Sequence, residues 1–550
     1  MPLQKKRNII QLTKKLALGL IALGIVAFVI GAIALYYHTR SDKYNLDNPE
    51  ASTIPSFKPI PLDFTHYYAE DISLPLAPSA LIDIDNDAVD EVFFGGGLEQ
   101  KDALLAYRDG KFVDIIAETG IPKKRNFTTL GVGSADFDNN GFTDLIVSRE
   151  DGLTIYYNQN GKFTAIQVGT PIDNQLTPTG ITLGDVNKDG HVDIFLTSCL
   201  RKDLQLELTG PVTKTYKSTG ALLINKGNNT FVNMTEEAGI AYDKNAYSGM
   251  IIDIDNNSWL DLVVAYENGE VRIYENTQDL NFVLRENPLT DKIASLTGIA
   301  SGDFNNDGFV DFFFSNSGST LPGFMAKKNA PDPSKVHQKW VLLRNDKGFK
   351  FTDVAEETKL ANYEWSKGAV MADMNNDGLQ DLIVAESDVD FLPNKYFKLP
   401  GRFLLQQPDT TFVPVEKKAG VVSREYSISP LVSDFNLDGY LDLIWTSINA
   451  PSQAYISDGG DNNFIQVKIA SDAVSLGAKI NVLTPNKNLL EHFVVGEGLC
   501  SDQTSLVHFG LGKDTKVYKI MIYYTDSYKD VVKNPKINTV VDVKQRHLNK

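Results

Sequence analysis

The chain has 550 residues, 42% hydrophobic and 22% charged, so it can bury a large core and is not compositionally disordered. Its formal net charge of -17 argues against nucleic acid as a partner, because a polyanion would be repelled over most of the surface. Its two cysteines, Cys199 and Cys500, cannot make a disulfide framework, although the two could pair with each other.

The N-terminal segment predicts a membrane anchor. Residues 1–15 form a basic tail, and residues 16–37 are uncharged and apolar. About 20 apolar residues let a helix cross a bilayer, so one transmembrane helix is expected here. By the positive-inside rule the N-terminus is cytoplasmic and the bulk of this single-pass protein is periplasmic or extracellular. The alternative is a signal peptide cleaved near Ala32-Ile33-Ala34. Residues 38–61, with four prolines, read as an irregular stalk.

An acidic nine-residue pattern then recurs seven times. It has Asp first, Asp or Asn at the third and fifth positions, and an acid at the ninth. The candidate ligands, by loop, are Asp83, Asp85, Asp87 and Glu91; Asp136, Asp138, Asn140 and Asp144; Asp185, Asn187, Asp189 and Asp193; Asp253, Asp255, Asn257 and Asp261; Asp303, Asn305, Asp307 and Asp311; Asp373, Asn375, Asp377 and Asp381; and Asp434, Asn436, Asp438 and Asp442. One match would be weak evidence, but seven are strong.

The chemistry of this pattern predicts calcium. Calcium takes ~6–8 oxygen ligands, and acids at alternate positions of a tight turn can point inward together. Glycine at the sixth position permits the sharp bend in five loops, whereas Ala88 and Ser258 stand there in loops 1 and 4, which are therefore expected to bind more weakly. The twelfth position is apolar or aromatic in every loop, so these are not EF-hands.

The metal prediction also accounts for the acidity of the chain. Seven Ca²⁺ ions would change the formal charge from -17 to -3. The alternative is that the loops are Asp/Asn/Gly turns without metal, since such turns favour these residues by themselves. Three carboxylates crowded into one turn would repel each other without a cation, which favours up to seven calcium sites.

The loops lie inside a larger repeat that predicts an all-β fold. Each unit has four candidate strands, and four-stranded units arranged radially form a β-propeller. We expect a seven-bladed β-propeller at residues 62–463, a small C-terminal β-domain at 464–550, and one N-terminal transmembrane helix. Because the last blade leads directly into that domain, residues 62–68 are predicted to supply the outer strand of the seventh blade.

The loops and the small apolar runs before them, as in residues 180–185 and 298–303, resemble the FG-GAP or VCBS repeats of integrin-α-like propellers. The turn-plus-phenylalanine stretch 222–240 is similar to the cartilage acidic protein branch, and residues 477–512 resemble its closing ASPIC/UnbV domain. Residues 524–527 read Tyr-Thr-Asp-Ser, where that family usually has a Trp-Pro-x-Gly turn. The resemblance implies a calcium-loaded propeller with a small β-domain and no settled biochemical activity.

Catalytic signatures are few. The seven histidines form no H-E-x-x-H motif, and no G-x-S-x-G elbow or Walker loop occurs. We therefore favour a membrane-anchored extracytoplasmic module for binding, adhesion or scaffolding. The alternative is an extracytoplasmic hydrolase, lyase or quinone-dependent oxidoreductase with an active site on the propeller axis.

Long insertions that join the second and third strands predict a partner surface on the face opposite the calcium loops. They carry basic residues suited to a protein or an anionic glycan. The candidate partner-binding residues are Arg201, Lys202, Lys327, Lys328, Lys395 and Lys398. The alternative is that these are solvated lysines on mobile insertions.

Overall fold

The computed structural model describes residues 19–32, 54–68, 74–122, 127–169, 172–201, 204, 220–317, 332–361, 363, 365–386 and 400–543. The chain divides into two compact units, Met1–Asn45 and Leu46–Lys550. In the first unit, residues 19–32 form an α-helix with exposed apolar side chains. Among the described residues, no helix has both the length and the apolar character that crossing a membrane requires. The predicted anchor at 16–37 extends beyond these residues on both sides.

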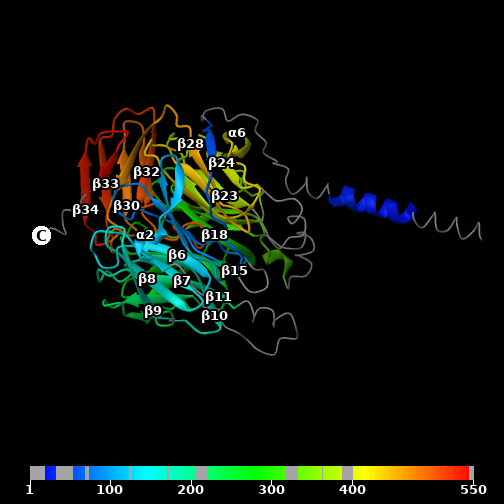
Figure 1. Cartoon of the computed structure of the whole chain (residues 1–550), viewed down its shortest axis with the longest axis horizontal. Coiled ribbons are helices and arrows are strands. Elements are labelled where there is room, and N and C mark those ends of the chain that lie inside the picture. Colours follow the sequence, from blue (N-terminus) through cyan, green and yellow to red (C-terminus); the bar gives the residue numbers. More distant parts are fainter. Residues whose placement is uncertain are drawn as a thin grey trace, which may run out of the picture. The chain divides into compact units, whose positions relative to one another are not determined.

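The second unit is an all-β structure (Figure 1). Between Phe57 and Ser457 the described residues form seven antiparallel groups of four strands, here called units one to seven, of which units four and five are joined in one eight-stranded sheet. Units one to three are β2 (Ser79–Ile82) to β5 (Lys111–Asp114) with β3 (Glu91–Phe94) and β4 (Ala103–Arg108); β6 (Thr129–Ala135), β7 (Asp144–Arg149), β8 (Gly152–Asn158) and β9 (Phe163–Gly169); and β10 (Leu176–Gly184), β11 (Asp193–Leu200), β12 (Ala221–Asn225) and β13 (Phe231–Asn233).

Units four to seven repeat this order. They are β14 (Ala246–Ile252), β15 (Asp261–Gly269), β16 (Val271–Asn276) and β17 (Phe282–Arg285); β18 (Ala294–Gly302), β19 (Asp311–Asn316), β20 (Val341–Asn345) and β21 (Phe351–Asp353); β22 (Ser366–Ala372), β23 (Asp381–Glu386), β24 (Arg402–Gln406) and β25 (Phe412–Pro414); and β26 (Tyr426–Ser433), β27 (Asp442–Ile448), β28 (Gln453–Ser457) and β1 (Phe57–Ile60). Short helices α2 (Ile116–Thr119), η1 (Pro333–Lys335) and α6 (Glu416–Ala419) lie between strands.

The first strands of the units form a closed circle, and the seven units together are called the ring. Each of β2, β6, β10, β14, β18 and β22 contacts the first strand of the next unit, and β26 contacts β2. Glycine permits this close approach, because a Cβ on Gly131 would lie 1.8 Å from the carbonyl oxygen of Thr179 in the next unit. The small residues seen before each loop therefore have a packing cause.

The circle is closed by a strand from near the N-terminus, although not by the predicted one. β1 pairs with β28, with Phe57 opposite Ser457 and Ile60 opposite Ala454. The assignment of 38–61 as stalk is therefore wrong at Phe57–Ile60. Residues 62–68 make only isolated bridges, Thr65 to Pro451 and His66 to Ile448. The prolines that indicated a stalk are compatible with β1 because β1 is an edge strand.

Deleting residues 54–60 should lower the melting temperature of the whole ring. The deletion removes the outer strand of unit seven and the buried ring of Phe57, which lies 6.2 Å from that of Phe403 in unit six. Loss of a buried phenylalanine alone costs about 3–5 kcal/mol. Differential scanning calorimetry checks this, and a melting curve equal to that of the full chain would refute closure by β1.

The C-terminal β-domain follows unit seven without a gap. It contains a three-stranded sheet with the strand order β32 (Leu506–Gly512), β29 (Asn463–Lys468) and β35 (Val540–Asp542). It also contains a four-stranded sheet with the strand order β31 (Asn488–His492), β30 (Lys479–Leu483), β33 (Lys519–Tyr523) and β34 (Lys529–Lys533). Its apolar residues share one buried cluster with units two and three, in which Ile465 and Val467 belong with Ile146 and Ile194. The domain is thus packed on the ring.

Candidate metal loops

Each acidic loop joins the first strand of a unit to the second, so the topology places all seven at the same end of the ring. Their backbones share one conformation. The fourth residue has φ between 54° and 66°, and the sixth between 69° and 89°, in every loop. Ala88 and Ser258 adopt this left-handed conformation without being glycine, which costs about 1 kcal/mol each. The turn is therefore maintained in loops 1 and 4.

The first aspartate of each loop fastens the turn. In loop 3, Asp185 Oδ1 accepts a hydrogen bond from the Asp189 N–H at 3.1 Å, and Oδ2 accepts one from the Gly190 N–H at 2.8 Å. The same two bonds occur in the other six loops. The first aspartate therefore also fixes the loop backbone.

The ninth acid is buried beneath the loop. Its side chain is 0% exposed in loops 2 to 7, where it is aspartate, and Glu91 of loop 1 is 7% exposed. In loop 3, Asp193 accepts bonds from the N–H groups of Val186 and of Asn225, at 3.1 and 2.8 Å. Each buried aspartate thus ties its loop to the end of the third strand.

Three loops bring carboxylates close together. Within the described residues, oxygen atoms of three acids lie within 4.8 Å of one another in each of the sets Asp83, Asp85 and Asp87; Asp136, Asp138 and Asp144; and Asp253, Asp255 and Asp261. In loops 3, 5, 6 and 7 the third position is Asn, whose side-chain amide donates a hydrogen bond to the aspartate at the fifth position. Each of the 28 predicted positions offers an oxygen atom as a metal ligand, and oxygen is the ligand atom that a hard cation such as Ca²⁺ prefers.

Burial raises the pKa of these acids. It raises the pKa of Asp144 and Asp193 to about 8 and that of Asp311 to about 9, and neighbouring loop carboxylates add to the effect. Burial raises the pKa of Asp185, the first aspartate of loop 3, to about 6. Buried carboxylates that neither bind a cation nor take up a proton are costly, so the loops fit a metal better than bare turns.

A recurring amide at the end of the third strand was missed in the sequence. In four units this side-chain amide donates a hydrogen bond of 2.7–3.1 Å to the backbone carbonyl of the second residue of the loop in the preceding unit. The four residues are Asn158, Asn276, Asn345 and Gln406. Each of these amides therefore connects two neighbouring loops. The sequence signal that could have found them is an amide that ends the third strand in five units.

The C-terminal domain covers much of the loop face. Lys468 Nζ contacts Asp83 Oδ2 of loop 1 at 2.5 Å, and Lys479 Nζ donates to Asn256 of loop 4 at 2.6 Å. Further contacts reach loop 2 through Ser471, loop 6 through Lys487 and His508, and loop 7 through Gln466. Five of the seven loops are thus in contact with this domain.

One segment of this domain, residues 495–503, fills the axis of the ring. It bonds to the first strand of every unit, through Ser79 and Leu81, Ser134, Thr182, Ser248, Ile299 and Ser301, Met371, and Ser429 and Val432. Its central acid is Asp502, which is 1% exposed and accepts bonds from the N–H and hydroxyl of Ser134 at 2.8 and 2.6 Å. We call this segment the axial plug.

The plug bears on the expectation of an axial active site. A cavity beside it is lined by Glu491, Glu497, His492 and His508, the mixture of acids and histidines that would favour an enzyme. Burial raises the pKa of Glu497 to about 8 and lowers those of both histidines to about 3. The cavity measures about 90 Å³, room for about three waters and far below the ~300 Å³ of ordinary ligand pockets. This volume gives no support to the enzyme alternative.

The predicted partner surface lies mostly outside the described residues. Of the six candidate residues only Arg201 is described, and it is exposed. The other five lie outside the described residues: Lys202, Lys327, Lys328, Lys395 and Lys398. Cys199 and Cys500 are both buried within one apolar cluster, and no disulfide joins them.

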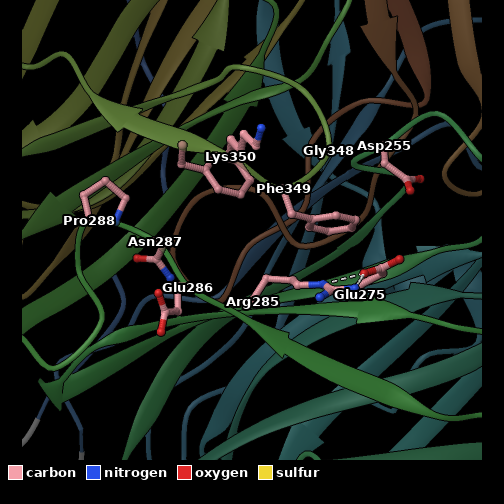
Figure 2. A pocket seen from close by; sticks show the side chains of 10 residues that line it. Asp255, Glu275, Arg285, Glu286, Asn287, Pro288, Gly348, Phe349 and Lys350 are labelled. Atoms are coloured by element: carbon pink, nitrogen blue, oxygen red, sulfur yellow. Dashed lines mark hydrogen bonds and ion pairs between the residues drawn. The ribbon is translucent and has the colours of Figure 1, made fainter.

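A surface groove of about 690 Å³ lies between units four and five. Figure 2 shows the ring of Phe349 above the ion pair of Arg285 and Glu275, with Asp255 of loop 4 at one end and Pro288 at the other. The groove is large enough for a small ligand and brings polar groups beside loop 4.

Comparison with known families confirms the resemblance seen in the sequence. Residues 136–196 and 253–314 match the FG-GAP-like repeat, and these ranges contain loops 2, 3, 4 and 5. Residues 469–550 match the family described as ASPIC and UnbV, which corresponds to the C-terminal β-domain.

The chain is also similar to curated proteins over most of its length. It is 22% identical over 507 residues to cartilage acidic protein 1 of Xenopus tropicalis, covering 85% of this chain and 73% of that protein. To the Homo sapiens protein of that name it is 21% identical over 465 residues, covering 79% and 67%. The solved structure of YCF48 bound to D1 peptide aligns with a TM-score of 0.40 at 11% identity, over 75% of this chain and all of that one.

Proposed function

Because the chain carries FG-GAP-like repeats followed by an ASPIC and UnbV domain, we propose that it is an extracytoplasmic binding or adhesion module. In this proposal the ring of seven four-stranded units is a seven-bladed β-propeller, and its loops hold calcium ions that stabilise it. A protein partner fits the repeat family, and an anionic glycan fits the basic insertions.

The observation that carries the calcium proposal is the repeated pair of acids at the first and ninth positions. These acids are buried, and their donors are exclusively oxygen. The residues that would hold Ca²⁺ are those at positions one, three, five and nine of each loop. When bound, the ion would neutralise carboxylates that the fold has removed from water. The protein supplies a turn that is already shaped by hydrogen bonds.

Calcium titration of single-loop variants tests this proposal. D189N removes one of the three charges of loop 3 and should weaken one site about tenfold while the other sites keep their affinity. D109N is the matched control, since Asp109 is an exposed turn aspartate outside the loops. Isothermal titration calorimetry gives the readout. Equal titrations for D189N, D109N and the unaltered chain would contradict calcium binding at loop 3.

The partner surface follows from what the C-terminal domain leaves free. Since this domain lies on the loop face and its plug fills the axis, we assign partner binding to the opposite face, where Arg201 is exposed. The other five basic residues belong to the same proposal. Residues 16–37 would anchor the module to the membrane. Membrane fractionation of cells expressing the full chain and a variant lacking 16–37 tests the anchor, which is excluded if both variants are equally soluble.

A further inference from the structure

Loop 1 differs from the other six in its charge. Its ligand positions carry four carboxylates, Asp83, Asp85, Asp87 and Glu91, and Asp90 adds a fifth acid to the loop, whereas the ligand positions of loops 2 to 7 carry three each. Asp83, Asp85 and Asp87 lie together, with oxygens within 4.8 Å of one another. One divalent cation would leave this loop more negative than its six neighbours.

The same loop receives a lysine from another part of the chain. Lys468 is the last residue of β29 in the C-terminal domain, and its Nζ lies 2.5 Å from Asp83 Oδ2. Its side chain is 18% exposed and that of Asp83 is 6% exposed, so water screens the pair only in part. No carboxylate of loops 2 to 7 forms an ion pair within 4.0 Å with any lysine or arginine that the structure describes.

We propose that Lys468 is a resident second cation of loop 1, which couples calcium binding at this loop to docking of the C-terminal domain. The inference rests on the proposed calcium function. With Lys468 counted, the four ligand positions of loop 1 have the same net charge as those of each other loop. An ammonium beside a divalent ion repels it, whereas the fourth carboxylate attracts it, so the two departures of loop 1 offset each other.

The test compares melting temperatures of K468M and the unaltered chain in excess EDTA and in millimolar calcium. Lys479 and Lys487 reach loops 4 and 6 at an amide and a carbonyl oxygen, whereas Lys468 is the only described lysine or arginine within 4.0 Å of a loop carboxylate. Without metal, the loss of Lys468 should therefore be felt most in EDTA. Removal of a like charge also tightens calcium binding at loop 1 by about tenfold, equivalent to about 1.4 kcal/mol. The drop in melting temperature should therefore be larger in EDTA than in calcium by about 1–2 °C.

A charge-balanced double variant separates this role from simple packing. D85N gives loop 1 the Asp-x-Asn-x-Asp pattern of loops 3, 5, 6 and 7. D85N/K468M should therefore lose the extra sensitivity to EDTA, and K468R should keep the behaviour of the unaltered chain. K513M is the control, because Lys513 is an exposed lysine of the same domain that donates only to the carbonyl of Asp461, at 2.9 Å.

The outcomes separate the two proposals. If calcium does not stabilise the unaltered chain, the calcium proposal fails and takes this inference with it. If calcium stabilises that chain but K468M loses equal stability in both conditions, the coupling through Lys468 is overturned and calcium binding stands.

Discussion

Excess EDTA is expected to lower the melting temperature by roughly 10–20 °C relative to millimolar calcium. A ligand that binds only the native state at a hundredfold excess over its Kd stabilises it by about 2.7 kcal/mol per site, and several sites add. The unfolding entropy of a domain of this size is on the order of 1 kcal/mol per kelvin, so each 1 kcal/mol of added stability raises the melting temperature by about 1 °C. Scanning calorimetry provides the measurement, and superimposed melts would contradict a stabilising metal.

The pH dependence of the metal-free protein has a definite sign. Burial raises the pKa of Asp144 and Asp193 to about 8, above the value of about 3.9 for an unfolded aspartate. The folded chain therefore holds more protons than the unfolded chain in this window, and stability falls as pH rises through it. In EDTA the melting temperature should be higher at about pH 5.5 than at about pH 8. With calcium the order should reverse, because protons compete with the metal.

Replacing Asp502 by alanine should destabilise the plug and the ring together. Asp502 is buried and accepts bonds from Ser134, Gly496 and Gln503. Removal of such an acceptor leaves buried donors without partners, at a cost of about 1–3 kcal/mol for each. We expect a melting temperature several degrees lower and faster proteolytic cleavage within residues 495–503.

The matched control for this variant is D461A. Asp461 is an exposed aspartate in the link between unit seven and the C-terminal domain. D502N is a milder variant, because its amide oxygen can still accept from Ser134. Should D502A and D461A melt and digest alike, the plug would not hold the ring together.

The acidic loops were predictable from the sequence because their cause is local. The first aspartate bonds to N–H groups four and five residues later, and the left-handed sixth residue favours glycine. Such short-range bonds leave a fixed spacing, and seven copies make that spacing plain. The four-strand repeat was predictable for a similar reason, because in units one to six each strand pairs with the strand that follows it in the chain.

The parts that were not predictable depend on contacts between distant residues. Asp502 and Ser134 are 368 positions apart, and nothing in the small polar residues around Asp502 indicates an axial position. Closure by β1 was predicted in kind but placed a few residues too late, since Phe57 and Phe64 are both buried phenylalanines in short extended segments. The pairing of Lys468 with Asp83 is of the same long-range kind.

The calcium content per chain tests most directly whether the acidic loops bind calcium. The full chain, purified in calcium and dialysed against metal-free buffer, can be analysed by inductively coupled plasma mass spectrometry with protein concentration from amino-acid analysis. Several equivalents of calcium per chain, up to seven, are expected, and they should be lost after exposure to EDTA at about pH 5.5. A chain that carries no calcium, or no more than a variant with every first and ninth loop acid changed to its amide, would contradict calcium binding by the acidic loops.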